Sequence, residues 1–281
     1  MSKKGKGHRV GQGKYPPKRG RNSGPARRTK PVRGMGDVEQ LEGRNVVLEA
    51  MRRKRRPVTR VLIDERAKPS GKVAEIIALA EEMQVSLRHV ARHKLDEMSA
   101  TGVHNGVIAF AKPHPRITVS ALLEDLFERG EDPFVVLVDQ VSYEQNLGAI
   151  MRSAMGAGVH AVVVPVRRGK GLSPVVQRVA MGGAEVVPLI REGLSSALAT
   201  LKRAGVRIVG ADMGGRPLWE VPMDGPLALV LGGEDKGLTD TLQKRCDAVV
   251  SVPLSHGLDS LNVSVTAGVM MFEKCRQDQA G

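Results

Sequence analysis

Short apolar runs recur between segments of helical spacing from Pro133 to the end of the chain. Six of these runs are rich in Val, Leu and Ile and hardly alternate with polar residues; they span 133–139, 160–165, 185–190, 206–212, 226–232 and 248–253. Strands with this pattern are covered on both faces, as in a parallel sheet. The pattern therefore predicts an α/β domain with six strands.

A shorter alternation of the same kind lies between Gly43 and Ala111. It predicts helices at 43–51 and 73–83 and strands at 58–64, 85–90 and 106–111. A unit of roughly 70 residues is at the small end of what folds by itself. Pro113, Pro115 and a polar stretch at 124–132 then interrupt the pattern. We therefore expect a small α/β/α domain at 39–113, a linker at 114–132 and the larger domain at 133–281.

The positive charge of the chain is concentrated at its N-terminus. Residues 1–36 hold 12 of the 43 Lys and Arg and none of the 30 Asp and Glu, so the net charge of +13 falls to +1 for the remaining residues. Such a segment, poor in apolar residues, cannot offset its ordering entropy, and we expect a disordered arm at 1–38. It would bind polyanions such as RNA. A solubilising or import tail is the alternative, although Gly and Pro suit an amphipathic transit helix poorly.

Composition excludes several classes of protein. No apolar run approaches the roughly 20 residues that cross a bilayer, and the basic N-terminus is not followed by an apolar segment, so we expect a cytoplasmic protein. Cys246 and Cys275 lack CxxC spacing and a nearby His cluster, so neither a disulfide nor a metal site is predicted. With 1 Trp, 2 Tyr and 4 Phe, base stacking on an aromatic platform is not expected.

Three segments of the larger domain place polar residues where a helix or strand begins or ends. In the first, 139–159, we expect Asn146 at the start of a helix and Arg152 on its polar flank. The apolar residues at helical spacing are expected to face the core; they are Leu147, Ile150, Met151, Ala154 and Met155. Taken alone, the two polar residues fit a helix cap and a solvated arginine equally well.

The second segment is a predicted strand that ends at Gly232 and Gly233 and is followed by Glu234. The carboxyl ends of parallel strands are where α/β sheets bind ligands, and glycine lets a flat ring approach the backbone. An ordinary turn is the alternative.

In the third segment, 252–272, we expect Ser260 to be the N-cap of a helix, with Asn262 and Ser264 in its first turn. The expected buried face consists of Leu261, Val265, Val269 and Phe272. A capped helix with incidental polar residues is the alternative.

Together these segments resemble the three signature motifs of the SpoU/TrmH branch of the SPOUT methyltransferases. N-x-G-x-x-x-R, G-x-E-x-x-G and S-L-N-V-S occur in that order at 146–152, 232–237 and 260–264. Three spaced motifs in order are far more specific than any one of them. The resemblance runs from about residue 43 to 276 and is strongest to bacterial enzymes that methylate a guanosine ribose in 23S rRNA. It includes the small domain, which looks like an L30e-like RNA-binding domain.

The resemblance implies a parallel sheet with a C-terminal trefoil knot, an exception to the rule of unknotted chains. It also implies a homodimer that binds S-adenosylmethionine in the knot, with RNA as substrate and with no metal. Carried over residue by residue, the cofactor-binding positions are Ala211, Asp212, Met213, Gly232, Gly233, Val252, Pro253, Leu254 and Leu261.

The catalytic positions implied by the resemblance are Asn146, Arg152, Glu234, Ser260 and Asn262. The matching arginine of the family has been proposed as general base for the ribose hydroxyl. Guanidinium groups stay protonated at physiological pH, since their pKa is about 12.5 or higher. We therefore expect Arg152 to stabilise the developing alkoxide and to grip the adjoining phosphate. The other four would orient the ribose, with Glu234 as the alternative proton acceptor.

Other readings of the chain fit less well. A dinucleotide-dependent dehydrogenase or a Rossmann-type methyltransferase needs a glycine-rich turn after the first strand, where this chain has DQVSYEQN. A tRNA ribose methyltransferase and a catalytically silent RNA-binding or ribosome-assembly protein remain as alternatives. One position departs from the family pattern: His256 stands where relatives carry a small residue, as a surface substitution or as a local change in the cofactor loop.

Overall fold

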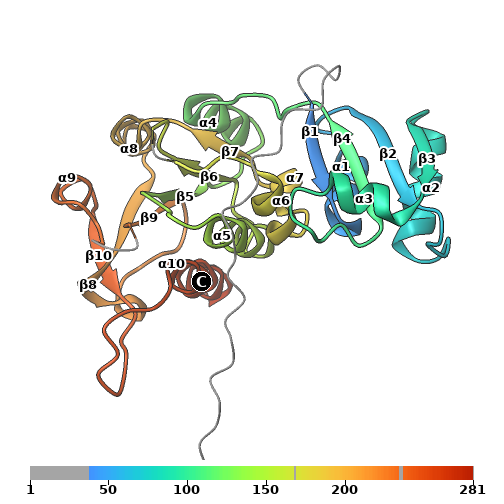
Figure 1. The fold of residues 1–281 in the computed structure, drawn as a ribbon. Coiled ribbons are helices and arrows are strands. Elements are labelled where there is room, and N and C mark those ends of the chain that lie inside the picture. The colour runs from blue at the N-terminus through green and yellow to red at the C-terminus, as the bar shows by residue number, and fades with distance from the viewer. Residues whose placement is uncertain (1–37, 168, 234–236, 281) are drawn as a thin grey trace, which may run out of the picture. The chain divides into compact units, whose positions relative to one another are not determined.

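In the computed structural model, residues 38–167, 169–233 and 237–280 are described. The basic arm expected at 1–38 lies, except for Val38, outside these residues. The described chain forms two sheets, each with its own helices (Figure 1).

The smaller sheet has four strands in the order β1-β4-β2-β3. Its strands are β1 Glu39–Glu42, β2 Val58–Asp64, β3 Ser86–Val90 and β4 Val107–Ala111; β2 and β3 are parallel, and β4 is antiparallel to both β1 and β2. Side chains alternate along a strand, so Val61 and Ile63 of β2 pack against α1 (Arg44–Arg53) and α2 (Lys72–Glu82). Leu62 packs on the opposite face, against Leu95 of α3 (Arg92–Met98).

Two elements of this unit were not predicted. The predicted helices and strands between residues 43 and 111 are confirmed to within two residues, but β1 and α3 had no apolar pattern to reveal them. β1 reads EQLE, and α3 reads RHKLDEM with Leu95 as its buried residue. Elements this short and polar depend on the neighbours that cover them.

The stretch expected to be a linker, 114–132, contains helix α4 (Val119–Glu128). Its side chains Val119, Leu122, Leu123 and Leu126 are buried in the core of the larger sheet, whereas the acidic residues that suggested a linker point to solvent. The Thr118 hydroxyl caps the helix by accepting the Ala121 N–H at 3.2 Å. Polar residues here mark the outer face of an amphipathic helix.

The larger sheet confirms the predicted six parallel strands. They are β5 Phe134–Val138, β6 Ala161–Val164, β7 Leu189–Arg191, β8 Arg207–Pro217, β9 Leu227–Leu231 and β10 Ala248–Ser251, in the order β10-β8-β9-β5-β6-β7. The run expected as a strand at 185–190 is only partly one. Its first residues end the short helix α7 (Gly183–Val186), and β7 begins at Leu189.

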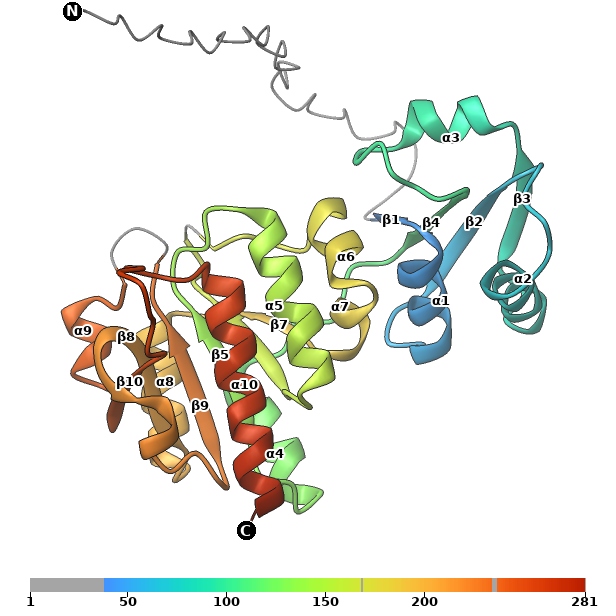
Figure 2. The same cartoon turned by 90° about the horizontal axis from the view of Figure 1, so that it is seen from below.

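Helices cover both faces of this sheet, as the continuous apolar strands require. One face packs against α5 (Glu144–Gly156), α6 (Pro174–Ala180), α7 and α10 (Val263–Ala280), with α5 and α10 side by side (Figure 2). The other face packs against α4, α8 (Leu194–Arg203) and α9 (Asp240–Gln243). A 3₁₀ turn, η1 (Leu218–Glu220), follows β8.

The expected buried face of α10 is wrong. Val265, Val269 and Phe272 are 50%, 38% and 52% exposed, and Leu261 precedes the helix. The helix instead buries Ala267, Met270, Met271 and Lys274. Met155 of α5, also expected in the core, is 38% exposed. The two neighbouring helices thus leave large apolar side chains uncovered.

None of the helices in the described residues is both long enough and apolar enough to cross a membrane.

Candidate functional site

The order of strands in the larger sheet brings the predicted site segments to one edge. β10, β8, β9 and β5 are adjacent and parallel, so the residues that follow them meet where these strands end. Helices α5 and α10 both begin at this end of the sheet (Figure 2). Glu234 lies outside the described residues.

A pair of asparagines joins the first and third predicted motifs. Asn262 Nδ2 donates a hydrogen bond to Asn146 Oδ1 at 3.2 Å, across 116 residues of sequence. The Oδ1 atom of Asn262 accepts the Ser264 N–H at 2.9 Å and the Ser264 hydroxyl at 2.6 Å. Asn262 is therefore the N-cap of α10. The prediction that Ser260 caps this helix is wrong, since Ser260 is exposed two residues earlier.

Glycines in the first motif and near it let helices approach closely. A Cβ on Gly148 of α5 would lie 2.6 Å from Val179 Cβ and 2.9 Å from the Val176 carbonyl oxygen in α6. A Cβ on Gly183 of α7 would lie 2.7 Å from the carbonyl oxygen of Met151 in α5. Real side chains do not fit at these separations, so the glycine of the N-x-G-x-x-x-R motif serves packing. The sequence pattern gave no sign of this role.

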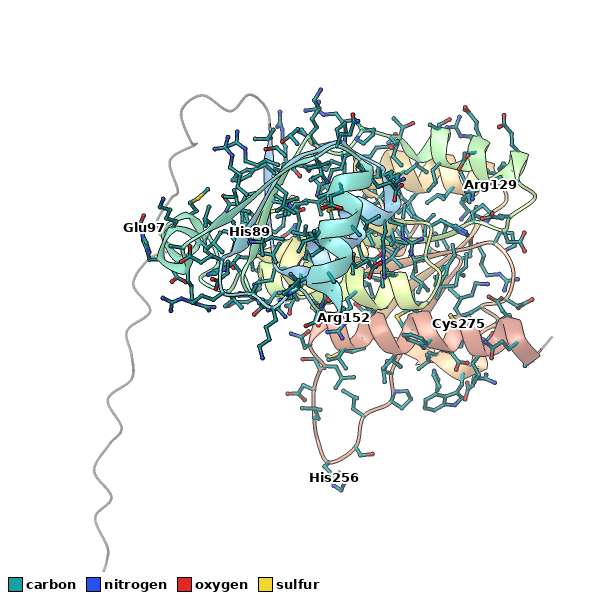
Figure 3. The ribbon with its side chains drawn as sticks, turned by 90° about the vertical axis from the view of Figure 1, so that its right-hand side faces the viewer. His89, Glu97, Arg129, Arg152, His256 and Cys275 are labelled. Carbon is teal, nitrogen blue, oxygen red and sulfur yellow. The ribbon has the colours of Figure 1, made fainter. Side chains whose placement is uncertain are left out.

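Arg152 is exposed on α5, near the first turns of α10 (Figure 3). Two neighbouring residues of the same helix, Met151 and Ala154, are buried and hold α5 against the sheet. Arg152 therefore stands on a helix that is packed into the core, and its side chain is exposed where a large substrate can reach it. Its position off the apolar stripe agrees with the pattern in the sequence.

The second motif is built on close backbone contacts. Gly233 and Gly237 exchange two backbone hydrogen bonds, at 3.0 and 3.1 Å. A Cβ on Gly232 would overlap the carbonyl carbon of Gly237. Gly237 has a φ of +63°, which glycine adopts without strain. Asp212 holds this end of the segment, since its Oδ2 accepts the Leu238 N–H at 3.3 Å and its Oδ1 accepts the Gly214 N–H at 3.2 Å.

Strand β8 bulges beside these glycines. β10 pairs with β8 up to Gly210 and resumes at Arg216, so residues 211–215 are looped out between the two. Gly215 packs so closely that a Cβ would lie 2.5 Å from the Val250 carbonyl carbon, and its own carbonyl accepts the Ser251 hydroxyl at 2.9 Å. Bulges of this kind re-aim the strand next to a site.

The predicted cofactor-binding residues differ in exposure along this edge. Half-buried positions are Ala211, Asp212, Gly233, Val252, Leu254 and Leu261, and Gly232 is buried. Met213 and Pro253 are exposed. His256 is exposed at the tip of the segment between β10 and α10, with a φ of +58° (Figure 3).

A buried charge cluster, which the sequence did not indicate, joins the small sheet to helices α6 and α7. The side chain of Arg56 is fully buried, and its guanidinium donates to Glu185 Oε2 at 3.2 Å, to Glu185 Oε1 and to Gln177 Oε1 at 2.7 Å. It also donates to Glu39. His114 Nε2 lies 3.3 Å from Glu185 Oε2. Burial raises the pKa of the Glu185 carboxyl, but the contacts from His114 and Arg56 outweigh this effect and lower it.

Among residues 38–167, 169–233 and 237–280, no three or more His, Cys, Asp or Glu side chains are grouped so that they could hold a metal ion.

Comparisons with known proteins match this architecture over nearly the whole described chain. Residues 133–272 match the SpoU rRNA Methylase family, and residues 40–116 match the family described as RNA 2'-O ribose methyltransferase substrate binding. The putative TrmH family tRNA/rRNA methyltransferase YacO of Bacillus subtilis is 34% identical over 238 residues, which cover 84% of this chain and 94% of that protein.

Two further relatives agree. The 23S rRNA (guanosine-2'-O-)-methyltransferase RlmB of Pseudomonas putida is 35% identical, with 87% of this chain and 99% of that protein covered. The crystal structure of AviRb, a SpoU methyltransferase from Streptomyces viridochromogenes in complex with AdoMet, has a TM-score of 0.73 at 23% identity, over 87% of this chain and 92% of that one. The chain therefore belongs to the SpoU family of RNA methyltransferases.

Proposed function

We propose that this protein transfers a methyl group from S-adenosylmethionine to the 2′-oxygen of a ribose in RNA, and that its substrate is a guanosine of 23S rRNA. Relatives that are about a third identical over most of their length carry that activity in their names. The observation that carries the proposal is the hydrogen bond between Asn262 and Asn146, which joins the first and third motifs at the edge where the glycines of the second motif lie.

We propose that this edge holds the largely uncharged adenosyl part of the methyl donor. Gly232 and Gly237 leave backbone rather than side chains around it, and the half-buried Ala211, Val252 and Leu254 offer small apolar surfaces. The carboxylate of Asp212 is engaged with two backbone N–H groups and fixes the bulge. We therefore assign cofactor binding to 211–213, 232–233, 252–254 and Leu261.

When bound, S-adenosylmethionine supplies an electrophilic methyl group on a sulfonium. Transfer of that group would require the 2′-oxygen to approach the methyl carbon in line with the departing sulfur, and the hydroxyl proton would have to pass to an acceptor. The chain therefore has to hold the ribose in that line and to accept the proton or stabilise the charge that develops on the oxygen.

We assign the stabilising charge to Arg152, which also contacts the phosphate next to the target ribose. Asn146 and Asn262, held to each other, orient the ribose, and we assign Ser260 to the same task. Glu234 orients Arg152 or takes the proton. Because α5 and α10 pack into one core, their backbones hold the starting points of these groups close together.

We assign RNA binding to the small unit. The four-stranded sheet with helices on both faces, together with the family match at 40–116, supports an L30e-like substrate-binding domain at 39–113. The methyltransferase domain would then occupy 133–281, and the basic residues of 1–38 would add phosphate contacts in a cytoplasmic protein.

The C-terminal topology supports a trefoil knot as part of this proposal. The chain passes from β8 to β9 on one side, then to β10 on the other side of β8. From β10 it returns to place α10 against α5 and β9. Such a double crossing at one edge is what a chain drawn through its own loop requires.

We also propose a homodimer. The uncovered apolar side chains of α5 and α10, Met155, Val265, Val269 and Phe272, form a stripe suited to a second copy. Sedimentation velocity is expected to give a dimer for the natural chain and a monomer for Phe272→Glu. A control change at another exposed aromatic residue, Phe127→Glu on α4, should leave the dimer intact.

The test of the proposed activity is transfer of labelled methyl to three unmodified RNAs: 23S rRNA, 16S rRNA and a tRNA pool, with Arg152→Ala as control. Label on a ribose of 23S rRNA supports the proposal and allows the nucleotide to be mapped. Label on tRNA alone keeps the reaction and changes the substrate. Cofactor binding without label on any RNA points to a ribosomal particle as substrate, and no cofactor binding overturns the proposal.

A further inference from the structure

An open cavity of about 810 Å³ lies on the small sheet unit, separate from the edge that holds the three motifs. Its charged lining consists of Arg44, Arg66, Lys68, Lys72, Arg92 and Asp64. Five positive side chains and one negative side chain give the lining a net charge of +4. A concave surface with that charge concentrates anions from solution.

The fold, rather than chance, gathers these cations. Arg66 and Lys68 follow the carboxyl end of β2, and Arg92 follows the carboxyl end of its parallel neighbour β3. Arg44 and Lys72 begin α1 and α2, the two helices on one face of the sheet. Three stretches that are distant in sequence, at 44, 66–72 and 92, therefore bring positive charge to one place.

The one carboxylate of the lining is already satisfied. Asp64 Oδ1 accepts the Arg66 backbone N–H at 3.0 Å, and its Oδ2 pairs with Arg92 at 3.3 Å. Arg44 donates to the carbonyl of Asn105 at 2.9 Å, and Lys72 donates to the side-chain oxygen of Asn45. Both acceptors are neutral, so four positive charges of the lining have no carboxylate within it to balance them.

Backbone dipoles add to the field of these side chains. Helices α1 and α2 begin next to the cavity, after Gly43 and Gly71, and neither glycine has a side chain to cap the first turn. The N–H groups of a helix's first turn and its dipole favour anions. Ser70, Asn45 and Asn105 supply neutral hydrogen-bonding groups between the cations.

We infer that this cavity binds backbone phosphates of the RNA substrate, as an anchoring site apart from the site of methyl transfer. The inference rests on the proposed function, since it takes RNA to be the substrate. The lining is polar and charged apart from Ala67 and Gly106, so it suits phosphates rather than a stacked base. Arginine and lysine neutralise phosphates without reading sequence, so the cavity contributes affinity and register, and the edge of the larger sheet contributes the chemistry.

The test compares two double variants of the full chain with equal loss of charge. Arg66→Gln with Lys68→Gln removes two exposed cations of the cavity, and Arg203→Gln with Lys244→Gln removes two exposed cations of the larger domain. Filter binding of full-length unmodified 23S rRNA is measured over a range of salt concentrations. The cavity variant should bind about tenfold more weakly and show a log–log salt slope smaller by about 1 to 2, and the control should stay within about twofold of the natural chain.

Methyl transfer provides the second readout. The cavity variant should raise KM for rRNA by about the same factor and leave kcat at saturating rRNA unchanged. The charge-preserving change Arg66→Lys with Lys68→Arg should restore both affinity and slope. Equal affinities of the cavity and control variants would overturn the inference.

The two proposals can fail separately. If the natural chain transfers methyl to rRNA and the cavity variant behaves like the control, the anchoring site is wrong and the activity stands. If the natural chain transfers no methyl but binds rRNA with an affinity that depends on the cavity, the activity is wrong and the anchoring site stands.

Discussion

The two sheets of this protein expose the carboxyl ends of their strands in different ways. At the larger sheet, Gly215 and Gly232 bring backbone against backbone at distances that leave no room for a methyl group. At the smaller sheet, the strands end beneath long, exposed cations such as Arg66 and Lys68. The first edge depends on shape, through its close backbone packing, and the second depends on charge, through its exposed cations. An added atom should therefore harm the first, and a lost charge should harm the second.

The largest effect is expected from Gly232→Ala. The new Cβ would overlap the backbone of Gly237, so the strand end and the segment after it must separate. We expect loss of detectable transfer and of cofactor binding, with the free energy of unfolding lowered by about 3 kcal/mol or more. The matched control is Gly193→Ala, where nothing lies within 4 Å and φ is −66°. Isothermal titration of the cofactor that gave natural affinity for Gly232→Ala would contradict a site set by shape.

The stability contributed by the buried cluster around Arg56 should also depend on charge, although the cluster is not exposed to solvent. Glu185→Ala leaves the Arg56 guanidinium buried with Glu39 as its remaining carboxylate partner, which should lower the free energy of unfolding by about 3–5 kcal/mol. Urea denaturation measures the loss. Glu128→Ala, at the exposed end of α4, removes the same charge and should cost less than about 0.5 kcal/mol.

The stability that Glu185 contributes should also depend on pH. Its folded pKa is lowered from the ordinary value of 4.5, so its stabilising contribution is complete above about pH 4.5 and is lost as the pH falls through the folded pKa. The natural chain should therefore lose stability more steeply below pH 4.5 than Glu185→Gln does. Parallel denaturation curves for the two proteins between pH 6 and pH 3 would show that Glu185 does not gain from its partners.

A charge can also matter at the edge that is set by shape. Arg152→Ala removes the guanidinium assigned to the transition state, and we expect kcat to fall about 10²–10³-fold with unchanged cofactor affinity and melting temperature. Arg203→Ala on α8, also exposed and on the other face of the sheet, should keep full activity. Near-normal turnover of Arg152→Ala would refute the assigned role.

A smaller effect is expected from Asn262→Ala. It removes the cap of α10 and the bond to Asn146, so we expect about 1 kcal/mol of lost stability and a roughly tenfold lower kcat. Thr118→Ala removes a comparable cap from α4, away from the site. If both variants lost activity equally, the asparagine pair would be a structural cap with no part in positioning.

Strands buried on both faces were the most predictable part of the fold. Their continuous apolar runs leave little choice of structure, and five of the six runs in the larger domain became strands at the expected place. The exception, 185–190, contains Glu185, whose buried partner Arg56 lies 129 residues away. Helix α10 shows the other limit, because Val265 and Phe272 have the pattern of a core face yet are exposed. Spacing alone cannot tell which of two apolar stripes a single chain will bury.

For the site, sequence indicated residue types better than contacts. The order of motifs predicted that Asn146 and Asn262 belong to one site, and the structure joins them by a hydrogen bond. The sequence could not show which residue of the S-L-N-V-S segment caps α10, because serine and asparagine, at 260 and 262, are both good N-cap residues. The cations of the small unit were also missed, since Arg44, the stretch 66–72 and Arg92 are far apart in sequence and only the sheet brings them together.

The contact between Gly232 and Gly237 also bears on how such proteins diverge. A neighbouring residue can compensate for the loss of a polar side chain at the edge. No other residue can replace a glycine when backbone atoms fill the space that a Cβ would need. A related protein with Asn146, Arg152 and Asn262 but with another residue in place of Gly232 would keep the polar residues of the site. It would lose the close backbone packing on which the site depends. Replacement of such a glycine is therefore a more reliable sign of lost activity in a related protein than replacement of a polar residue.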